Sequence, residues 1–178
     1  MKASDVWVLP KHELAKLLAN GYAIDPQALV DGDYRGVSLG LPRLIEKATW
    51  KVFRKVFRQD ETSGQVHGHN VRMHEPATLT PLEDGGEQTT PREKNGQPII
   101  FGPYSVESLP ADGSPFKCRA GLLINYCAKH PQLHPLSLVR DPVVALREGD
   151  ARLLLGATYL AGVFSARTPS FFTLERER

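Results

Sequence analysis

The sequence predicts an α+β fold in which antiparallel strands dominate and curl into a β-barrel or half-barrel, accompanied by two helices. Three observations predict it. Apolar residues recur every three or four positions before residue 60 and tend to alternate with period two afterwards. No strand–helix–strand alternation follows residue 60, which favours antiparallel pairing. Glycines occur within the predicted strands, where they allow the curvature that a barrel requires.

The first predicted helix spans residues 5–20. Its Leu14, Leu17 and Leu18 have helical spacing, and Asn20-Gly21 is a typical helix stop. The second and clearest amphipathic helix is expected at about 43–58, directly after Pro42. Its apolar face comprises Leu44, Ile45, Ala48, Val52, Phe53, Val56 and Phe57. Six lysines and arginines occupy much of the remaining surface of this helix.

Seven segments have the character of strands. The first spans 34–40, after the Asp31-Gly32-Asp33 turn. The others are 66–74, 99–108, 116–129, 138–147, 152–160 and 171–176. Glu148-Gly149-Asp150 is a short hairpin signal between two of them. Consecutive antiparallel strands of this kind favour an up-and-down barrel.

Residues 75–98 are rich in Pro, Gly, Thr and Glu, with turn signals at Asp84-Gly85-Gly86 and Asn95-Gly96. A connection of this length without secondary structure is uncommon inside a compact domain. We therefore expect a long mobile loop here, either a lid or a poorly ordered excursion.

Length and composition place the chain among ordinary globular proteins. Its 178 residues, 41% hydrophobic and 24% charged, predict a single domain over 1–178. A net charge of +2 is small for a nucleic-acid-binding protein, so we expect no nucleic-acid partner. Charged residues interrupt the N-terminal segment, and no run of 18 apolar residues exists, which argues against a secretory signal and a membrane-spanning helix.

The two cysteines, Cys118 and Cys127, both fall in the strand predicted at 116–129. Nine residues of strand span roughly 30 Å, whereas a disulfide requires Cα atoms within about 7 Å. We therefore expect two free thiols, which suit a reducing, cytoplasmic location.

The second half of the chain carries a series of signals in a recognisable order. They are Asp112-Gly113, then Leu123-Ile124-Asn125-Tyr126, Arg140-Asp141-Pro142, Leu154-Leu155-Gly156 and Phe171-Phe172-Thr173-Leu174. This order resembles small bacterial lipocalin-like (calycin-type) barrel proteins of unknown function, including relatives named for a GXWXG motif. The resemblance covers roughly residues 31–176 in spacing. The GXWXG motif itself is absent, since Ala48-Thr49-Trp50-Lys51-Val52 surrounds the tryptophan. The resemblance implies a barrel with an internal pocket and supplies no catalytic residue.

Residues 36–40, Gly-Val-Ser-Leu-Gly, match the G-x-S-x-G nucleophile elbow of α/β-hydrolases. The match lies between a predicted strand and a predicted helix, as that motif requires. A hydrolase elbow, however, follows several parallel strands, and here only a helix and a turn precede it. The alternative, favoured by this context, is a curved strand in which Ser38 is an ordinary residue.

Three histidines form another candidate site. On a strand, His67 and His69 share one face and His74 lies on the other. Possible third metal ligands are Glu75, His130 and His134. The spacing resembles the HxH of cupin barrels, but the acidic residue and glycines of that motif do not follow. Two ligands alone do not define a metal site, so we expect no metal and no other cofactor.

Six polar residues in predicted strands are the candidate ligand-binding residues: Tyr34, Tyr104, Tyr126, Arg140, Asp141 and Tyr159. Alternate residues of a barrel strand point inward, so some of these would be the few polar groups of a mostly apolar pocket. A Tyr–Asp or Arg–Asp pair there could polarise a carbonyl or move a proton. Alternatively, Arg140 and Asp141 face opposite ways, one paired at the surface and the other capping the turn before Pro142.

Three functions remain open. The first is binding of a small hydrophobic molecule inside a lipocalin-like barrel. The second is a cofactor-independent enzyme of the isomerase, cyclase or dehydratase type, with Tyr and Asp or His as acid and base. The third is a peripheral interaction module that uses the basic helix at 43–58, with weak contact to anionic lipid. The fold class does not choose among them, and the ligand and oligomeric state stay open.

Overall fold

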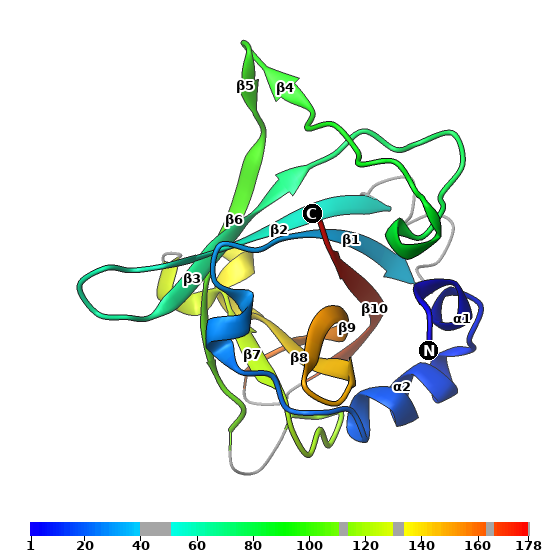
Figure 1. The fold of residues 1–178 in the computed structure, drawn as a ribbon. Helices are drawn as coiled ribbons and strands as arrows, with labels where there is room; N and C mark the ends of the chain where they lie inside the picture. The colour runs from blue at the N-terminus through cyan, green and yellow to red at the C-terminus, as the bar shows by residue number, and fades with distance from the viewer. Residues whose placement is uncertain (40–50, 111–113, 130–133, 163–165, 178) are drawn as a thin grey trace.

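The computed structural model describes residues 1–39, 51–110, 114–129, 134–162 and 166–177. Within them, eight antiparallel strands form a closed barrel in the order β1-β10-β9-β8-β7-β6-β3-β2 (Figure 1). The strands are β1 (Asp33–Leu39), β2 (Val52–Gln59), β3 (Val66–Arg72), β6 (Ile100–Ser108), β7 (Leu122–Asn125), β8 (Val139–Arg147), β9 (Asp150–Leu160) and β10 (Ala166–Arg176). Neighbouring barrel strands are consecutive in the chain, and β1 pairs with β10 to close the circle. The predicted antiparallel barrel is confirmed.

The N-terminal helical segment consists of two helices, α1 (Ala3–Trp7) and α2 (Lys11–Ala19). The prediction of a helix at 5–20 is therefore correct in type, but the helix is interrupted at Pro10. Proline disfavours helical backbone at the residue before it, so the chain leaves the first helix and restarts with Pro10 as N-cap of the second. Both helices lie against the outside of the barrel at β8, β9 and β10, where Val6, Leu14 and Leu18 are buried (Figure 1).

The helix predicted at 43–58 is wrong for residues 52–58, because β2 occupies Val52–Gln59. Residues 43–50 lie outside the described residues. The error has a physical cause: β2 is buried on both faces. Val52 and Val56 pack outside the barrel with Val71 and Met73, while Phe57 packs inside it. Adjacent apolar residues that point to opposite faces of a strand, such as Val52-Phe53 and Val56-Phe57, have the same sequence spacing as the apolar face of a helix.

Over residues 52–58, this correction removes the exposed apolar helix face that an interaction module would use. Val52, Val56 and Phe57 are all buried. Two of the basic residues on β2 are paired, Arg54 with Glu177 and Arg58 with Asp33.

One half of the barrel interior is filled by side chains. The rings of Tyr34, Phe57, Tyr104 and Tyr126 form a series with centroid separations of 5.3, 5.6 and 5.6 Å. Leu122, Ile124, Val143, Leu154 and Leu174 surround them, and Ile24 and Leu29 belong to the same cluster. Leu29 belongs to a short 3-10 turn, η1 (Pro26–Leu29), which adds its side chain to this packed half of the barrel.

Gly68 on β3 allows the closest approach inside this packed half. A Cβ atom at that position would lie 1.9 Å from the Val56 carbonyl oxygen and 2.8 Å from the Tyr104 ring. The Tyr104 hydroxyl donates a hydrogen bond to the same carbonyl oxygen at 3.1 Å. The absence of a side chain at Gly68 is therefore what lets the Tyr104 ring cross β3.

Residues 75–98 contain a 3-10 turn, η2 (Leu82–Asp84), and a short hairpin of β4 (Glu93–Lys94) and β5 (Gln97–Pro98) that projects from the barrel (Figure 1). A buried ion pair at 2.6 Å between Arg35 and Glu175 ties this segment to β1 and β10. Arg35 donates to the Thr80 carbonyl, and Glu175 accepts from the Leu82 amide. Part of the predicted loop is thus hydrogen-bonded to the barrel wall.

The strand predicted at 116–129 is much shorter, since β7 covers only Leu122–Asn125. Positive φ angles at Lys117 (59°) and Gly121 (110°) turn the chain before the strand begins. Cys118 therefore precedes β7, and Cys127 opens a 3-10 turn, η3 (Cys127–Lys129), so the two do not share a strand. Both are free thiols, as expected. Among the described residues, no helix is long and apolar enough to cross a membrane.

Candidate ligand-binding cavity

The other half of the barrel interior is a cavity of about 290 Å³. Its wall is mostly apolar and includes Phe53, Leu136, Val139 and Phe172. The wall also includes Ser38, Phe101, Gly102 and Ser170. Five further residues form what we call the polar cluster: Lys55, Asn70, Tyr126, Asp141 and Thr158. Because barrel strands alternate inward and outward residues, these side chains from β2, β3, β8 and β9 and from the end of β7 meet at one level.

Lys55 is the centre of the polar cluster and is only 2% exposed. Its Nζ atom donates to the Tyr126 hydroxyl at 2.6 Å and to Asn70 Oδ1 at 3.0 Å. A third, longer contact of 3.4 Å reaches Asp141 Oδ2. An ammonium group has three donors, so all three have an acceptor inside the protein.

The partners of Lys55 are themselves held in place. The Tyr126 hydroxyl donates to Asp141 Oδ2 at 3.1 Å, and Thr158 Oγ1 donates to Asp141 Oδ1 at 2.8 Å. Asn70 Nδ2 donates to the Gly102 carbonyl at 3.0 Å, which leaves Asn70 Oδ1 facing the lysine. Both oxygens of the Asp141 carboxylate accept hydrogen bonds, so the orientation of this carboxylate is fixed from two sides.

The electrostatics of the cluster are set by burial. Removal from water lowers the pKa of Lys55, and the neighbouring Asp141 carboxylate opposes that shift. Burial raises the pKa of Tyr126 well above its ordinary value, and the charge of Asp141 adds to the effect. At neutral pH, Tyr126 is therefore a protonated donor.

Aromatic rings surround the lysine amine. Its Nζ atom lies 4.9 Å from the Tyr104 ring centroid and 5.4 and 5.7 Å from those of Phe172 and Phe53. Such rings attract a cation, but they also exclude the water that would otherwise hydrate it. The pKa of Lys55 therefore depends on burial and on the charge of the neighbouring Asp141 carboxylate.

Two of the six candidate residues from the sequence, Tyr126 and Asp141, line the cavity. Tyr34 and Tyr104 also point into the barrel, but they belong to the packed half. The Tyr104 hydroxyl is hydrogen-bonded to the barrel backbone.

The other two candidates lie away from the cavity. Arg140 donates to the carbonyls of Ser137 and Val139 at 2.8 Å each, so it holds the turn that precedes β8. Tyr159 is buried in the cluster between the barrel exterior and the N-terminal helices. Arg140 and Asp141 do face opposite ways, as the alternative interpretation proposed.

Sequence reasoning missed Lys55, Asn70 and Thr158. Lys55 was assigned to the polar face of a helix that does not form at β2. The available signal was Phe53-x-Lys55-x-Phe57, in which period two places a single lysine between two phenylalanines on one strand face. Asn70 follows the same parity on β3, two residues after Gly68.

Ser38 lies on β1 and lines the cavity, with its amide donating to the Lys51 carbonyl at 2.9 Å. Residues 36–39 are extended strand in an antiparallel barrel, so the nucleophile-elbow interpretation is wrong for them. Gly40 lies outside the described residues.

The histidines do not reach the cavity. His67 and His69 alternate with the inward residues of β3, so they lie on its outer face, and His74 is exposed. Within the described part of the chain, no group of three or more His, Cys, Asp or Glu side chains is placed to hold a metal ion. His130 lies outside that part.

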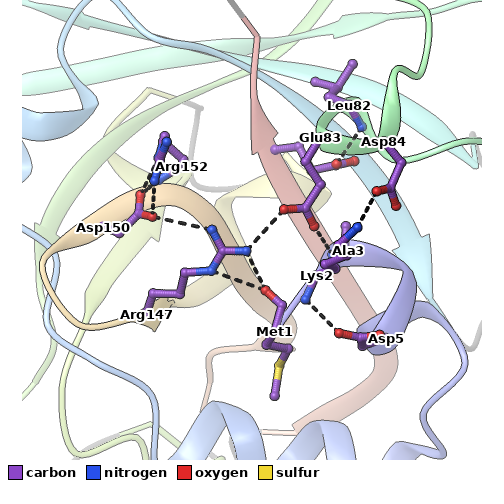
Figure 2. Close-up of polar contacts among 11 residues, drawn as sticks. Met1, Lys2, Ala3, Asp5, Leu82, Glu83, Asp84, Arg147, Asp150 and Arg152 are labelled. Carbon is purple, nitrogen blue, oxygen red and sulfur yellow. Dashed lines mark hydrogen bonds and ion pairs between the residues drawn. The ribbon is translucent and has the colours of Figure 1, made fainter.

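A second hollow, of about 550 Å³, lies near the opposite end of the barrel; we call it the rim hollow. Figure 2 shows its neighbourhood, where Arg147 donates to the Met1 carbonyl and pairs with Glu83 and Asp150. Arg152 also pairs with Asp150. These contacts join the N-terminus, η2 and the β8–β9 hairpin to one another. The charges of the rim hollow are thus engaged in holding structure together, whereas the barrel cavity combines apolar walls with converging titratable groups.

Comparisons with protein-family models, with curated proteins and with solved structures find no match to this chain. The eight-stranded antiparallel barrel is consistent with a calycin-like fold. The GXWXG-type relationship suggested by the sequence has no support from these comparisons, so function has to be argued from the cavity.

Proposed function

We propose that this chain binds one small, mostly apolar and electrically neutral molecule in the barrel cavity, with an oxygen atom of that molecule at the polar cluster. The observation that carries the proposal is the division of the barrel interior into a packed half and a cavity with apolar walls and one polar end. Binding sites for small molecules have this composition. A lipocalin-like mode of binding, with the ligand inside the barrel, follows from it.

The size of the cavity limits the ligand. At roughly 30 Å³ for each water-sized atom, the cavity of about 290 Å³ holds about ten non-hydrogen atoms. A long-chain lipid is therefore too large for the cavity as it stands, whereas a short aliphatic or monocyclic molecule fits.

The charge of the cluster limits the ligand further. Lys55 and Asp141 neutralise each other, so a carboxylate ligand would meet a buried carboxylate as well as an ammonium. A carbonyl or hydroxyl oxygen can accept from Lys55 in place of its long, 3.4 Å contact with Asp141, without adding a buried charge. Neutral ligands are thus favoured over fatty acids and over amines.

A second candidate function is a cofactor-independent enzyme that uses the same cavity. The specific observation in its favour is that an amine, a phenol and a carboxylate from three different parts of the barrel converge at the cavity, at Lys55, Tyr126 and Asp141. Converging titratable groups with shifted pKa values are typical of active sites. The isomerase, cyclase or dehydratase types proposed from the sequence all act beside a carbonyl or hydroxyl group.

We also propose a reducing location such as the cytoplasm. Cys118 and Cys127 are free thiols, and paired cysteines are the rule in oxidising compartments.

Native mass spectrometry of protein purified without detergent tests the binding function. We expect a stoichiometric small-molecule adduct, or one that forms on adding short-chain alcohols and ketones. Val139→Trp fills the cavity and should abolish the adduct. Leu138→Trp is the matched control, because the neighbouring Leu138 is 49% exposed and does not line the cavity. Equal adduct formation by both variants would place binding elsewhere.

A further inference from the structure

Stability does not explain why a buried Lys55–Asp141 ion pair stands at this position. A buried ion pair contributes little to stability compared with apolar residues of similar volume, because desolvation of two charges offsets their attraction. The barrel interior around Lys55 is otherwise built from aromatic and aliphatic side chains that pack without charges. A methionine would fill the same space at β2. The lysine is therefore better explained by what its amine can do at the cavity.

The position of the amine suits reaction with a bound ligand. Lys55 lines the cavity, and its Nζ atom is held by contacts from three sides. An oxygen of a ligand at the polar cluster, as proposed above, would bring its own carbon beside this nitrogen. Oriented reactants of this kind react far faster than free ones.

We propose that Lys55 condenses with the carbonyl group of a small apolar aldehyde or ketone to form an imine between ligand and protein. The inference rests on the proposed function, because the carbonyl compound has to occupy the cavity first. It names the ligand class and assigns Lys55 the role of nucleophile.

The polar cluster contains the groups that this reaction needs. The Lys55 ammonium passes one proton to Asp141, which lies 3.4 Å away, and the neutral amine attacks the carbonyl carbon. Once Asp141 is protonated, the Tyr126 hydroxyl turns its hydrogen bond from that carboxyl group to the carbonyl oxygen of the ligand as the carbon–nitrogen bond forms. That oxygen takes up a proton released by the attacking nitrogen, which gives a carbinolamine.

The second half of the reaction returns the cluster to its starting charge. Asp141 gives its proton to the carbinolamine hydroxyl, which leaves as water while the carbon–nitrogen double bond forms. An ammonium and a carbonyl compound have become a protonated imine and one water, and Asp141 is a carboxylate again. No oxidant, reductant or metal takes part. A protonated imine withdraws electrons from the adjacent carbon, which is the activation that isomerases and dehydratases use.

Burial supports this role independently of the contacts. An amine attacks only in its neutral form, and the pKa of Lys55 is lowered by removal from water. Each unit of lowering raises the neutral fraction near pH 7.5 by about tenfold.

The test uses hexanal, whose size suits the cavity, with sodium cyanoborohydride to reduce any imine to a stable secondary amine. Peptide mapping by mass spectrometry then gives the labelling rate of every lysine. We expect Lys55 to be labelled at least about tenfold faster than the exposed Lys16, because the cavity holds the aldehyde beside the Lys55 amine. In Val139→Trp, labelling of Lys55 should be lost and labelling of Lys16 unchanged. Asp141→Asn should shift the pH profile of Lys55 labelling toward lower pH, because the Asp141 carboxylate raises the pKa of Lys55.

A parallel titration with 1-hexanol separates the two proposals, because this alcohol fits the cavity but cannot form an imine. Binding of hexanol without labelling of Lys55 by hexanal would overturn the imine and leave the proposed function standing. If hexanol fails to bind and Lys55 stays unlabelled, both proposals are overturned. Selective labelling of Lys55 that Val139→Trp abolishes supports both.

Discussion

The Nζ atom of Lys55 lies 2.6 Å from the hydroxyl oxygen of Tyr126, and the same hydroxyl donates to Asp141 at 3.1 Å. One phenol thus connects a buried amine with a buried carboxylate at the boundary between the packed half of the barrel and its cavity. Any change to one member leaves the others buried and short of a partner.

Lys55→Met should therefore destabilise the fold strongly. It leaves the Asp141 carboxylate buried without its cation, a change that costs about 3–5 kcal/mol. The double variant Lys55→Met with Asp141→Asn removes both charges and should recover a large part of that loss. Urea unfolding measures both free energies. The control is Lys51→Met, since Lys51 is exposed, with an expected change within about 0.5 kcal/mol. A double variant as unstable as the single one would contradict this account.

Stability should fall at alkaline pH through the buried tyrosines. Burial raises the pKa of Tyr34 to about 12, above its unfolded value near 10. Between these pH values the unfolded chain has lost the phenol proton while the folded chain keeps it. Folding then loses up to about 1.4 kcal/mol per pH unit from this group.

Tyr34→Phe should make that alkaline loss shallower, because the titrating group is gone. It should also cost little at neutral pH, since the described residues place no hydrogen-bond partner at the buried Tyr34 hydroxyl. The free energies of unfolding of Tyr34→Phe and of the unmodified protein, measured at pH 9 and pH 11, test this prediction. Tyr22→Phe is the matched control, as Tyr22 is 44% exposed. Parallel pH curves for Tyr34→Phe and the unmodified protein would refute the assignment.

Gly68→Ala should disrupt the packed half of the barrel. The added Cβ would overlap the Val56 carbonyl and press on the Tyr104 ring, and overpacking of this kind costs about 1–3 kcal/mol. Gly162→Ala is the control, because none of the described residues lies within 4 Å of its Cβ position. Thermal unfolding of the two variants should separate them clearly, and similar midpoints would show that β3 can shift to make room.

Two of the attachments of the 75–98 segment should differ in strength. Arg35→Met leaves Glu175 buried and uncompensated, at a cost of about 3–5 kcal/mol, and frees the backbone at Thr80. Arg147→Met removes a partly exposed contact to Glu83, worth at most about 1 kcal/mol (Figure 2). Limited trypsin digestion at Arg92 and Lys94 should therefore accelerate much more in Arg35→Met. Equal acceleration would mean that the buried pair does not anchor the segment.

Most barrel strands could be predicted because their signals are local. The hairpin between β8 and β9 is an example, since Glu148-Gly149-Asp150 marks a tight turn between two alternating segments. The strand β2 could not be recognised in the same way. The 75–98 segment covers its outer face, and that cover is a tertiary contact that no local pattern shows.

The candidate site was predicted only in part for a related reason. Tyr126 and Asp141 were recognised as polar residues of strands, but Lys55 was hidden by the helical interpretation of β2. The face of a strand on which a residue lies depends on the register of that strand. A shift of the register by one residue moves every side chain to the opposite face. Arg140 and Tyr159 were therefore named alongside Asp141, although both point away from the barrel axis.

The pairing of β1 with β10 has a consequence for synthesis of the protein. At about 5–20 residues per second, the ribosome delivers β10 on the order of ten seconds after β1. During that interval β1 has an edge with unsatisfied backbone groups, which can pair with the same edge of another nascent chain. A transcript cut before β10 should therefore yield insoluble protein, even though it encodes every member of the polar cluster.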